Sequence, residues 1–131
     1  MDFRTIINIP LSDIRIDHST RMMLFGSCFS ENIGRKLLQS GFRVDTNPFG
    51  ILYNPFSIAT AMQRLLSATP FLEADLVWNN GIYHSLMHHG RFSDPDKAAC
   101  LRNISTRFEN AVQQIKQTDI FLITFGSAYA Y

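Results

Sequence analysis

The sequence has 131 residues, of which 46% are hydrophobic and 18% are charged, with a formal net charge of +1. This length and apolar content suit one small folded domain, and the balanced charge excludes the basic footprint of a nucleic-acid-binding protein. No apolar run is long enough for a membrane span. The first residues lack the basic and apolar regions of a signal peptide, so the expected location is cytoplasmic. Two cysteines, Cys28 and Cys100, form no disulfide framework.

The chain begins with a lead-in. Residues 3–9 alternate in polarity and predict an edge strand that Pro10 ends. Residues 22–25 then form a continuous apolar run, typical of a short buried strand. Gly26 follows directly and permits a sharp backbone turn.

A helix is predicted immediately after that turn. Ser30 is the expected N-cap, residues 31–39 the helix, and Gly41 its end. Its expected apolar face comprises Ile33, Leu37 and Leu38. Cys28 thereby lies at the carboxyl end of a strand, where ligands bind in open α/β sheets. The neighbouring helix dipole favours a thiolate, so Cys28 is a candidate nucleophile.

The middle of the chain predicts a second strand and a second helix. Residues 42–46 form the strand, and together with the preceding strand and helix they predict a βαβ unit. A dense loop follows, in which Asn54 is expected to cap a helix with Pro55 at its first position. This helix should end near Ser67, and its expected buried stripe is Phe56, Ala59, Met62, Leu65 and Leu66.

The remaining elements are a hairpin, a long helix and a strand. Asn80-Gly81 lies between two apolar segments within residues 76–84 and predicts a type I′ turn. A long helix is expected from Asp94 to about Lys116, with Cys100 in the core. Residues 119–125 are continuously apolar, which is typical of a strand buried on both faces.

Two of the predicted strands end in the same three residues, Phe25-Gly26-Ser27 and Phe125-Gly126-Ser127. In a parallel sheet both turns lie on one edge, so they converge on one cleft if the strands are neighbours. The sequence ends soon after the second of these strands, without a helix to cover it. We therefore expect residues 1–131 to be the N-terminal part of a single, longer domain.

The segment Gly26-Ser27-Cys28-Phe29-Ser30 resembles the signature of the GSCFA family, whose last position is usually alanine. The context is similar along almost the whole chain, through Glu31-Asn32-Ile33-Gly34, residues 47–55, His84-Ser85 and Gly126-Ser127-Ala128-Tyr129. The family, largely bacterial, is in turn similar to the SGNH/GDSL hydrolases. The resemblance implies an α/β fold, a flavodoxin-like three-layer α/β/α sandwich with a mostly parallel sheet, here with a β-hairpin insertion.

The resemblance also implies roles for individual residues. Cys28 takes the place of the serine nucleophile, and Gly50 that of the glycine whose N–H helps to hold the oxyanion. The Gly-x-Asn block falls on Gly126-Ser127-Ala128, where Ala128 has no side-chain donor. Ser127 or Tyr129 would have to compensate. The histidine of the family's closing block is expected beyond Tyr131.

Other residues have a structural as well as a functional interpretation. Ser27 is an alternative nucleophile, although its hydroxyl is better suited to stabilising the turn or the helix start. Asn47 and Gly50 shape either the oxyanion loop or an ordinary turn, in which glycine allows a positive φ and asparagine forms an Asx-turn. Phe49, Tyr53 and Tyr129 line either a substrate pocket or the core. His84 could act as a base or bind substrate, but a packed hairpin histidine is the simpler interpretation.

We expect no metal or other cofactor. His84, His88 and His89 lack the glutamate of the His-Glu-x-x-His zinc motif. The favoured function is that of an acyl-ester hydrolase or acyltransferase, with a small-molecule or glycan ester as substrate and the chain beyond Tyr131 as a structural partner. A non-catalytic glycan- or ligand-binding module is the alternative. A redox-active thiol is disfavoured, because no second cysteine follows Cys28 closely.

Overall fold

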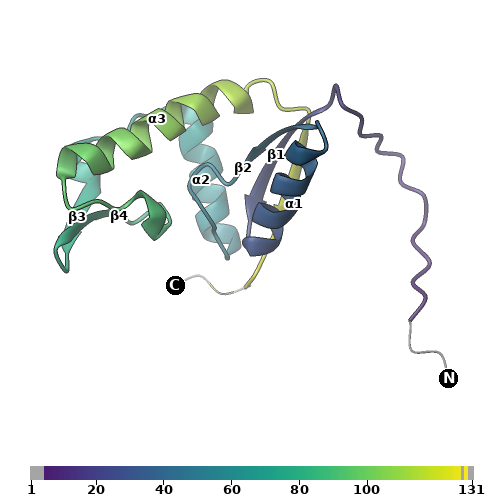
Figure 1. Cartoon of the computed structure of the whole chain (residues 1–131), viewed down its shortest axis with the longest axis horizontal. Helices are drawn as coiled ribbons and strands as arrows, with labels where there is room; N and C mark the ends of the chain where they lie inside the picture. The colour runs from purple at the N-terminus through teal and green to yellow at the C-terminus, as the bar shows by residue number, and fades with distance from the viewer. Residues whose placement is uncertain (1–4, 128, 130–131) are drawn as a thin grey trace.

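The computed structural model describes residues 5–127 and 129. The elements are β1 (Arg21–Gly26), α1 (Cys28–Gln39), β2 (Arg43–Thr46), α2 (Pro55–Ser67), η1 (Glu73–Asp75), β3 (Leu76–Asn79), β4 (Ile82–Ser85), η2 (Gly90–Phe92), α3 (Lys97–Ile115) and β5 (Ile120–Thr124). Figure 1 shows the sheet and α1 on one side of the molecule and the β3–β4 hairpin at the far end of α3.

The main sheet is parallel, with strand order β2-β1-β5. β1 is central, and its residues Met22 to Phe25 are all buried. In sequence order the strands of this sheet lie second, first, third, which is the order with which flavodoxin-like sheets begin. The α/β class expected from the sequence is therefore confirmed, as is the separate antiparallel hairpin.

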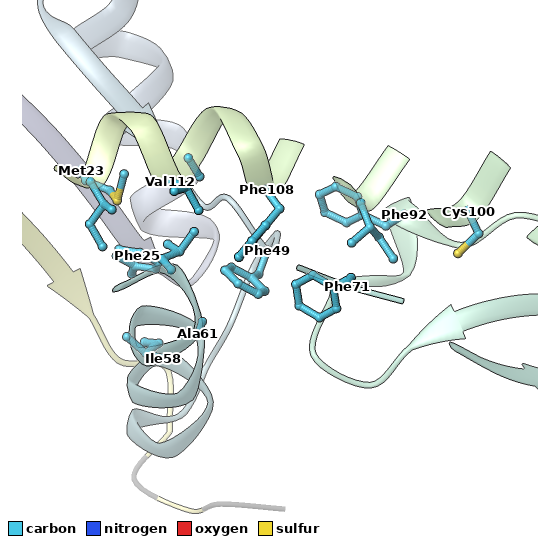
Figure 2. Packing of buried hydrophobic residues seen from close by; sticks show 14 of the residues in the cluster. Met23, Phe25, Phe49, Ile58, Ala61, Phe71, Phe92, Cys100, Phe108 and Val112 are labelled. Carbon is cyan, nitrogen blue, oxygen red and sulfur yellow. The ribbon is translucent and has the colours of Figure 1, made fainter. Parts of the chain in front are cut away.

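Helices cover both faces of this sheet. α1 packs against β1 and β2, whereas Met23 and Phe25 of β1 belong to a core shared with α2 and α3. Phe49, Phe71 and Phe108 meet edge to face in the middle of that core, as Figure 2 shows. Such aromatic pairs contribute about 0.5–1.5 kcal/mol each beyond their burial. Phe49 thereby packs the loop between β2 and α2 against the core.

The start of α1 differs from the sequence-based expectation. The N-cap is Ser27, whose Oγ accepts the N–H of Phe29 at 3.3 Å, so the helix begins at Cys28. Ser30 is instead buried in the first turn, where its hydroxyl donates to Phe25 O at 3.1 Å. The expected apolar face is also wrong at Leu38, which is 61% exposed. Ser30 and Gly34 are the residues that α1 buries, because the helix lies close to the sheet.

α2 has the predicted ends but not the predicted buried face. Asn54 caps it by accepting the N–H of Ser57 at 2.8 Å, with Pro55 at the first position. The buried residues are Ile58, Ala61 and Leu65. Of the expected stripe, Phe56, Ala59 and Leu66 are exposed, Met62 is half-buried and only Leu65 is buried. The buried face is thus rotated from the expected one, and it packs into the core that α2 shares with α3.

The hairpin and α3 agree with the prediction. Asn80 and Gly81 both have positive φ angles, 50° and 83°, as a type I′ turn requires. α3 begins one turn later than Asp94, because Asp96 is its cap and accepts from Ala98 and Ala99. Cys100 is buried, as expected.

Two further expectations for the ends of the chain are wrong. Residues 5–9, the described part of the expected edge strand, form no strand, and Ile6, Ile7 and Ile9 are exposed. β5 is not buried on both faces, since Phe121 and Ile123 are 39% and 41% exposed. β5 is an edge strand of the described sheet, so it lacks a neighbour on one side. Within residues 5–127 and 129, no helix combines the length and the apolar character that crossing a membrane requires.

Candidate functional site

Three turns meet at the carboxyl edge of the parallel sheet. β1 and β5 are neighbours, in a register that pairs Gly26 with Thr124, so the two Phe-Gly-Ser turns lie side by side as predicted. The loop before α2 supplies the third turn: Tyr53 O accepts N–H groups from Gly126 at 2.8 Å and Ser127 at 3.0 Å. The two turns approach closely here, since a Cβ on Gly126 would lie 2.7 Å from Tyr53 Cδ1 and would displace that ring.

Cys28 directly follows the first of these turns, as the first residue of α1. Its side chain is exposed, whereas the only other cysteine, Cys100, is buried. The first backbone N–H groups of a helix have no intrahelical acceptor. Ser27 Oγ accepts the N–H of Phe29, so the N–H of Cys28 itself is the donor best placed for an oxygen held beside the thiol. The position therefore combines an accessible nucleophile with a backbone donor.

Ser27 has a structural role. Its Oγ is the helix cap, and it also lies 3.4 Å from Thr124 Oγ1 of β5. The same threonine hydroxyl bonds Ser30 Oγ at 2.7 Å. The interpretation of Ser27 as a stabiliser of the helix start is thus confirmed, and Thr124 joins β5 to the start of α1.

A network of polar side chains is hydrogen-bonded to the turn before Cys28. Asn47, which is 1% exposed, accepts the N–H of Gly26 at 2.9 Å and donates from Nδ2 to Glu31 Oε2 at 2.7 Å. Arg91 donates to Glu31 Oε1 at 2.9 Å and to Asn47 O at 3.1 Å. Burial opposes ionisation of Glu31, but the hydrogen bonds from Asn47 and Arg91 outweigh it and lower the pKa of this carboxyl.

The expected oxyanion donor, Gly50, is engaged in this loop. Its N–H donates to Asn47 O at 2.8 Å, which closes a tight turn. Its φ is +83°, and a Cβ would lie 2.3 Å from His89 Cβ, so only glycine fits. Gly50 is therefore a turn residue in this structure, and its N–H is already bonded. Asn47 is likewise a structural residue of the loop, since its Oδ1 accepts from Gly26 and its Nδ2 donates to Glu31.

The residues expected to contact substrate separate into two groups. Tyr53 and Tyr129 are exposed near the carboxyl edge, at 50% and 76%, and Tyr129 N donates to Ser127 Oγ at 3.0 Å. Phe49 is 1% exposed and stacks on His88 with ring centroids 4.6 Å apart, so it is a core residue rather than a pocket residue. Ala128, at the expected asparagine position, lies outside the described residues.

The histidines of the hairpin region are engaged in local contacts. His84 Nδ1 lies 2.8 Å from Ser93 Oγ, which makes it the packed hairpin histidine of the simpler interpretation. His88 Nδ1 lies 2.8 Å from Ser85 Oγ, and burial of its ring lowers its pKa to about 4. Among residues 5–127 and 129, no three His, Cys, Asp or Glu side chains are grouped as a metal site would require.

Glu31, Arg91 and Thr124 belong to the site without having been predicted from the sequence. Glu31 carries a weak signal, since an acidic residue in the first helical turn is favourable on its own. Arg91 lies 60 residues from its partner Glu31, and nothing local indicates their pairing. The position of Thr124 beside Gly26 depends on the register of β5 on β1, which the sequence does not specify.

No curated protein and no solved structure matches this chain. The family comparison agrees with the resemblance carried by the segment around Cys28. The model of the GSCFA family matches residues 21–131, from the first residue of β1 onward, and the chain therefore belongs to the GSCFA family.

Proposed function

We propose that this protein is an acyl-ester hydrolase or acyltransferase with Cys28 as its nucleophile. The observation that carries the proposal is the exposed Cys28 thiol in the first turn of α1, beside the two Phe-Gly-Ser turns. A helix start and a carboxyl strand edge are where enzymes place activated cysteines and bind ligands. An acylated carbohydrate or a similar ester is the proposed substrate class.

The proposed reaction has two steps. The Cys28 thiolate adds to the acyl carbonyl carbon, and the ester C–O bond breaks, so that the alcohol leaves with a proton and a thioester remains. Water, or an acceptor alcohol in the transferase case, then attacks the thioester, and the thiol is regenerated. The N–H of Cys28 stabilises the oxyanion, without Gly50. The general base is proposed to be a histidine beyond Tyr131, since His84 and His88 bond to serines of their own region.

The test uses the natural protein, including any polypeptide that follows Tyr131. Hydrolysis of p-nitrophenyl acyl esters is compared for the wild type, Cys28→Ala and Cys28→Ser, with Cys100→Ala as the matched control. We expect Cys28→Ala to lower kcat by on the order of a thousandfold or more, and Cys100→Ala to retain activity. Unchanged turnover in Cys28→Ala would remove Cys28 from the mechanism.

A second candidate function is a binding module that has kept the fold without catalysis. The bonded N–H of Gly50 favours it, because one expected oxyanion donor is occupied. This alternative predicts no turnover of any ester, combined with an increase in Tm on addition of an acetylated oligosaccharide. Ester turnover that is lost in step with alkylation of Cys28 would exclude it.

A further inference from the structure

A small cavity opens at the start of α2, next to the loop that carries Tyr53. Its volume is about 190 Å³, and it is lined by Leu52, Phe56, Ser57, Thr60, Leu86 and Met87. Four of these six side chains are apolar. A cavity of about 150 Å³ is enough to hold a benzene ring, so this one has room for an acyl group of several carbons.

The wall of the cavity is bonded directly to the turn that carries Cys28. Leu52, which lines the cavity, donates its N–H to Gly26 O at 3.0 Å, two residues before the thiol. The next residue, Tyr53, accepts the N–H groups of the neighbouring Gly126 turn. A Cβ on Gly126 would lie 3.6 Å from both Tyr53 Cβ and Ser27 Cβ, so these three positions are contiguous. The segment that lines the cavity through Leu52 is therefore hydrogen-bonded to both Phe-Gly-Ser turns, one of which leads directly into Cys28.

Two large apolar side chains are exposed on this cavity. Phe56 of α2 is 69% exposed, and Leu86, in the loop after β4, is 86% exposed. They come from segments 30 residues apart, yet both line the same cavity. Exposed apolar area that a ligand can cover gains about 25 cal/mol per Å² on burial. The cavity therefore favours a hydrocarbon group over a charged one, with the hydroxyls of Ser57 and Thr60 as its polar side.

We propose that this cavity is the acyl-group subsite of the protein, which takes the hydrocarbon chain of an ester whose carbonyl lies at Cys28. The inference rests on the proposed function and adds a substrate preference to it: esters of acids with several carbons are preferred over acetyl esters. Phe56 and Leu86 cover the chain, and Thr60 contributes to the wall of the subsite.

The experiment measures kcat/KM for p-nitrophenyl hexanoate and p-nitrophenyl acetate with the natural protein. Thr60→Phe fills the cavity and Phe56→Ser opens its wall, and each should lower the hexanoate-to-acetate ratio about tenfold. Leu66→Ser is the matched control, because Leu66 is equally exposed, at 70%, at the other end of the same helix. The control should leave the ratio unchanged. A ratio that is the same in all four proteins would overturn the subsite while leaving Cys28 hydrolysis intact.

A binding measurement separates this inference from the proposed function. Hexanamide, which offers the acyl chain without a labile ester, is titrated into Cys28→Ala protein and followed by amide NMR. Signals of Leu52 and Met87 should shift, and Thr60→Phe in the same background should abolish the shifts. Such shifts, combined with a wild-type protein that turns over no ester, would support the acyl site and overturn the hydrolase. Absence of shifts at these residues would overturn the acyl site, whatever the turnover.

Discussion

Asn47 and Gly26 are joined across the carboxyl edge of the sheet by a buried hydrogen bond, from the Gly26 N–H to Asn47 Oδ1, at 2.9 Å. The Asn47 main chain is bonded to the same strand, since its N–H donates to Leu24 O at 2.8 Å. Its Nδ2 reaches Glu31 in the first turn of α1. One side chain thus fixes both ends of the turn that presents Cys28.

We expect Asn47→Ala to lower the free energy of unfolding by about 1–3 kcal/mol, the cost of leaving buried polar groups unpaired. Strain adds to this cost, because Asn47 has a φ of 45°, in the left-handed region that asparagine tolerates better than alanine. Urea denaturation of the wild type and the variant measures the difference. Asn47→Gly removes the side chain without the strain, so its free energy of unfolding should lie between those of the wild type and Asn47→Ala.

Asn32→Ala is the control for the asparagine substitution. Asn32 is exposed on α1, and its amide oxygen accepts a hydrogen bond from Arg35. It should change the free energy of unfolding by less than about 0.5 kcal/mol. If Asn47→Ala were as mild as Asn32→Ala, the Asn47–Gly26 bond would not hold the turn.

Gly34→Ala should destabilise the protein although alanine favours a helix by about 1 kcal/mol over glycine. Gly34 faces β2, where an added Cβ would lie 2.1 Å from Thr46 Oγ1 and 2.8 Å from its Cγ2. Overpacking of this kind costs about 1–3 kcal/mol, and a β-branched threonine has little freedom to move away. Thermal unfolding should therefore show a lower Tm. Gly90→Ala meets no atom within 4 Å and should leave the Tm nearly unchanged; a stabilised Gly34→Ala would contradict the close approach of α1 to β2.

The elements predicted correctly are those that depend on residues close together in the sequence. The apolar run before Gly26, the Asn54-Pro55 helix start and the Asn80-Gly81 turn each depend on residues within a few positions of one another. The meeting of the two Phe-Gly-Ser turns was also predictable, because parallel neighbours end on the same edge.

Tertiary contacts determine what the sequence did not reveal. Both Ser27 and Ser30 suit a helix cap, and only the packing of Ser30 against Phe25 O and Thr124 decides between them. The N–H of Gly50 was expected to be available to an oxyanion. It donates instead to the carbonyl oxygen of Asn47, whose backbone has a left-handed conformation. Periodicity finds an amphipathic helix without fixing its rotation, which is why Phe56 was expected in the core and lies on the surface.

His88 should make the stability of the protein depend on pH between about 6.5 and 4. Burial, followed by the nearby Arg64 charge, lowers the pKa of His88 to about 4 from 6.5. As the pH falls below 6.5, His88 becomes protonated in the unfolded chain but stays neutral in the folded protein. The free energy of unfolding therefore decreases until about pH 4, where His88 of the folded protein is protonated as well. The full effect is up to about 3 kcal/mol. Urea denaturation at half-unit pH steps measures it.

Two variants isolate the contribution of His88. His88→Phe keeps a ring stacked on Phe49 but cannot titrate, so the decrease in stability between pH 6.5 and 4 should become smaller. Ser85→Ala removes the hydroxyl that bonds Nδ1 while leaving the imidazole in place, so it should lower stability at neutral pH but keep the pH dependence. An identical pH dependence in the wild type and His88→Phe would mean that other groups cause it.

Cys28 and Cys100 should differ strongly in their reaction with iodoacetamide, because only Cys28 is exposed. Cys100 has no exposed surface, its Sγ lies 3.5 Å from Tyr83 O, and burial raises the pKa of its thiol. Labelling of Cys100 requires local opening, so it should be on the order of a hundredfold or more slower. Peptide mass spectrometry against time measures both rates, and both thiols should react alike in concentrated urea. Equal rates in the folded protein would contradict the burial of Cys100, and a protected Cys28 would remove the accessible nucleophile on which the proposed hydrolysis depends.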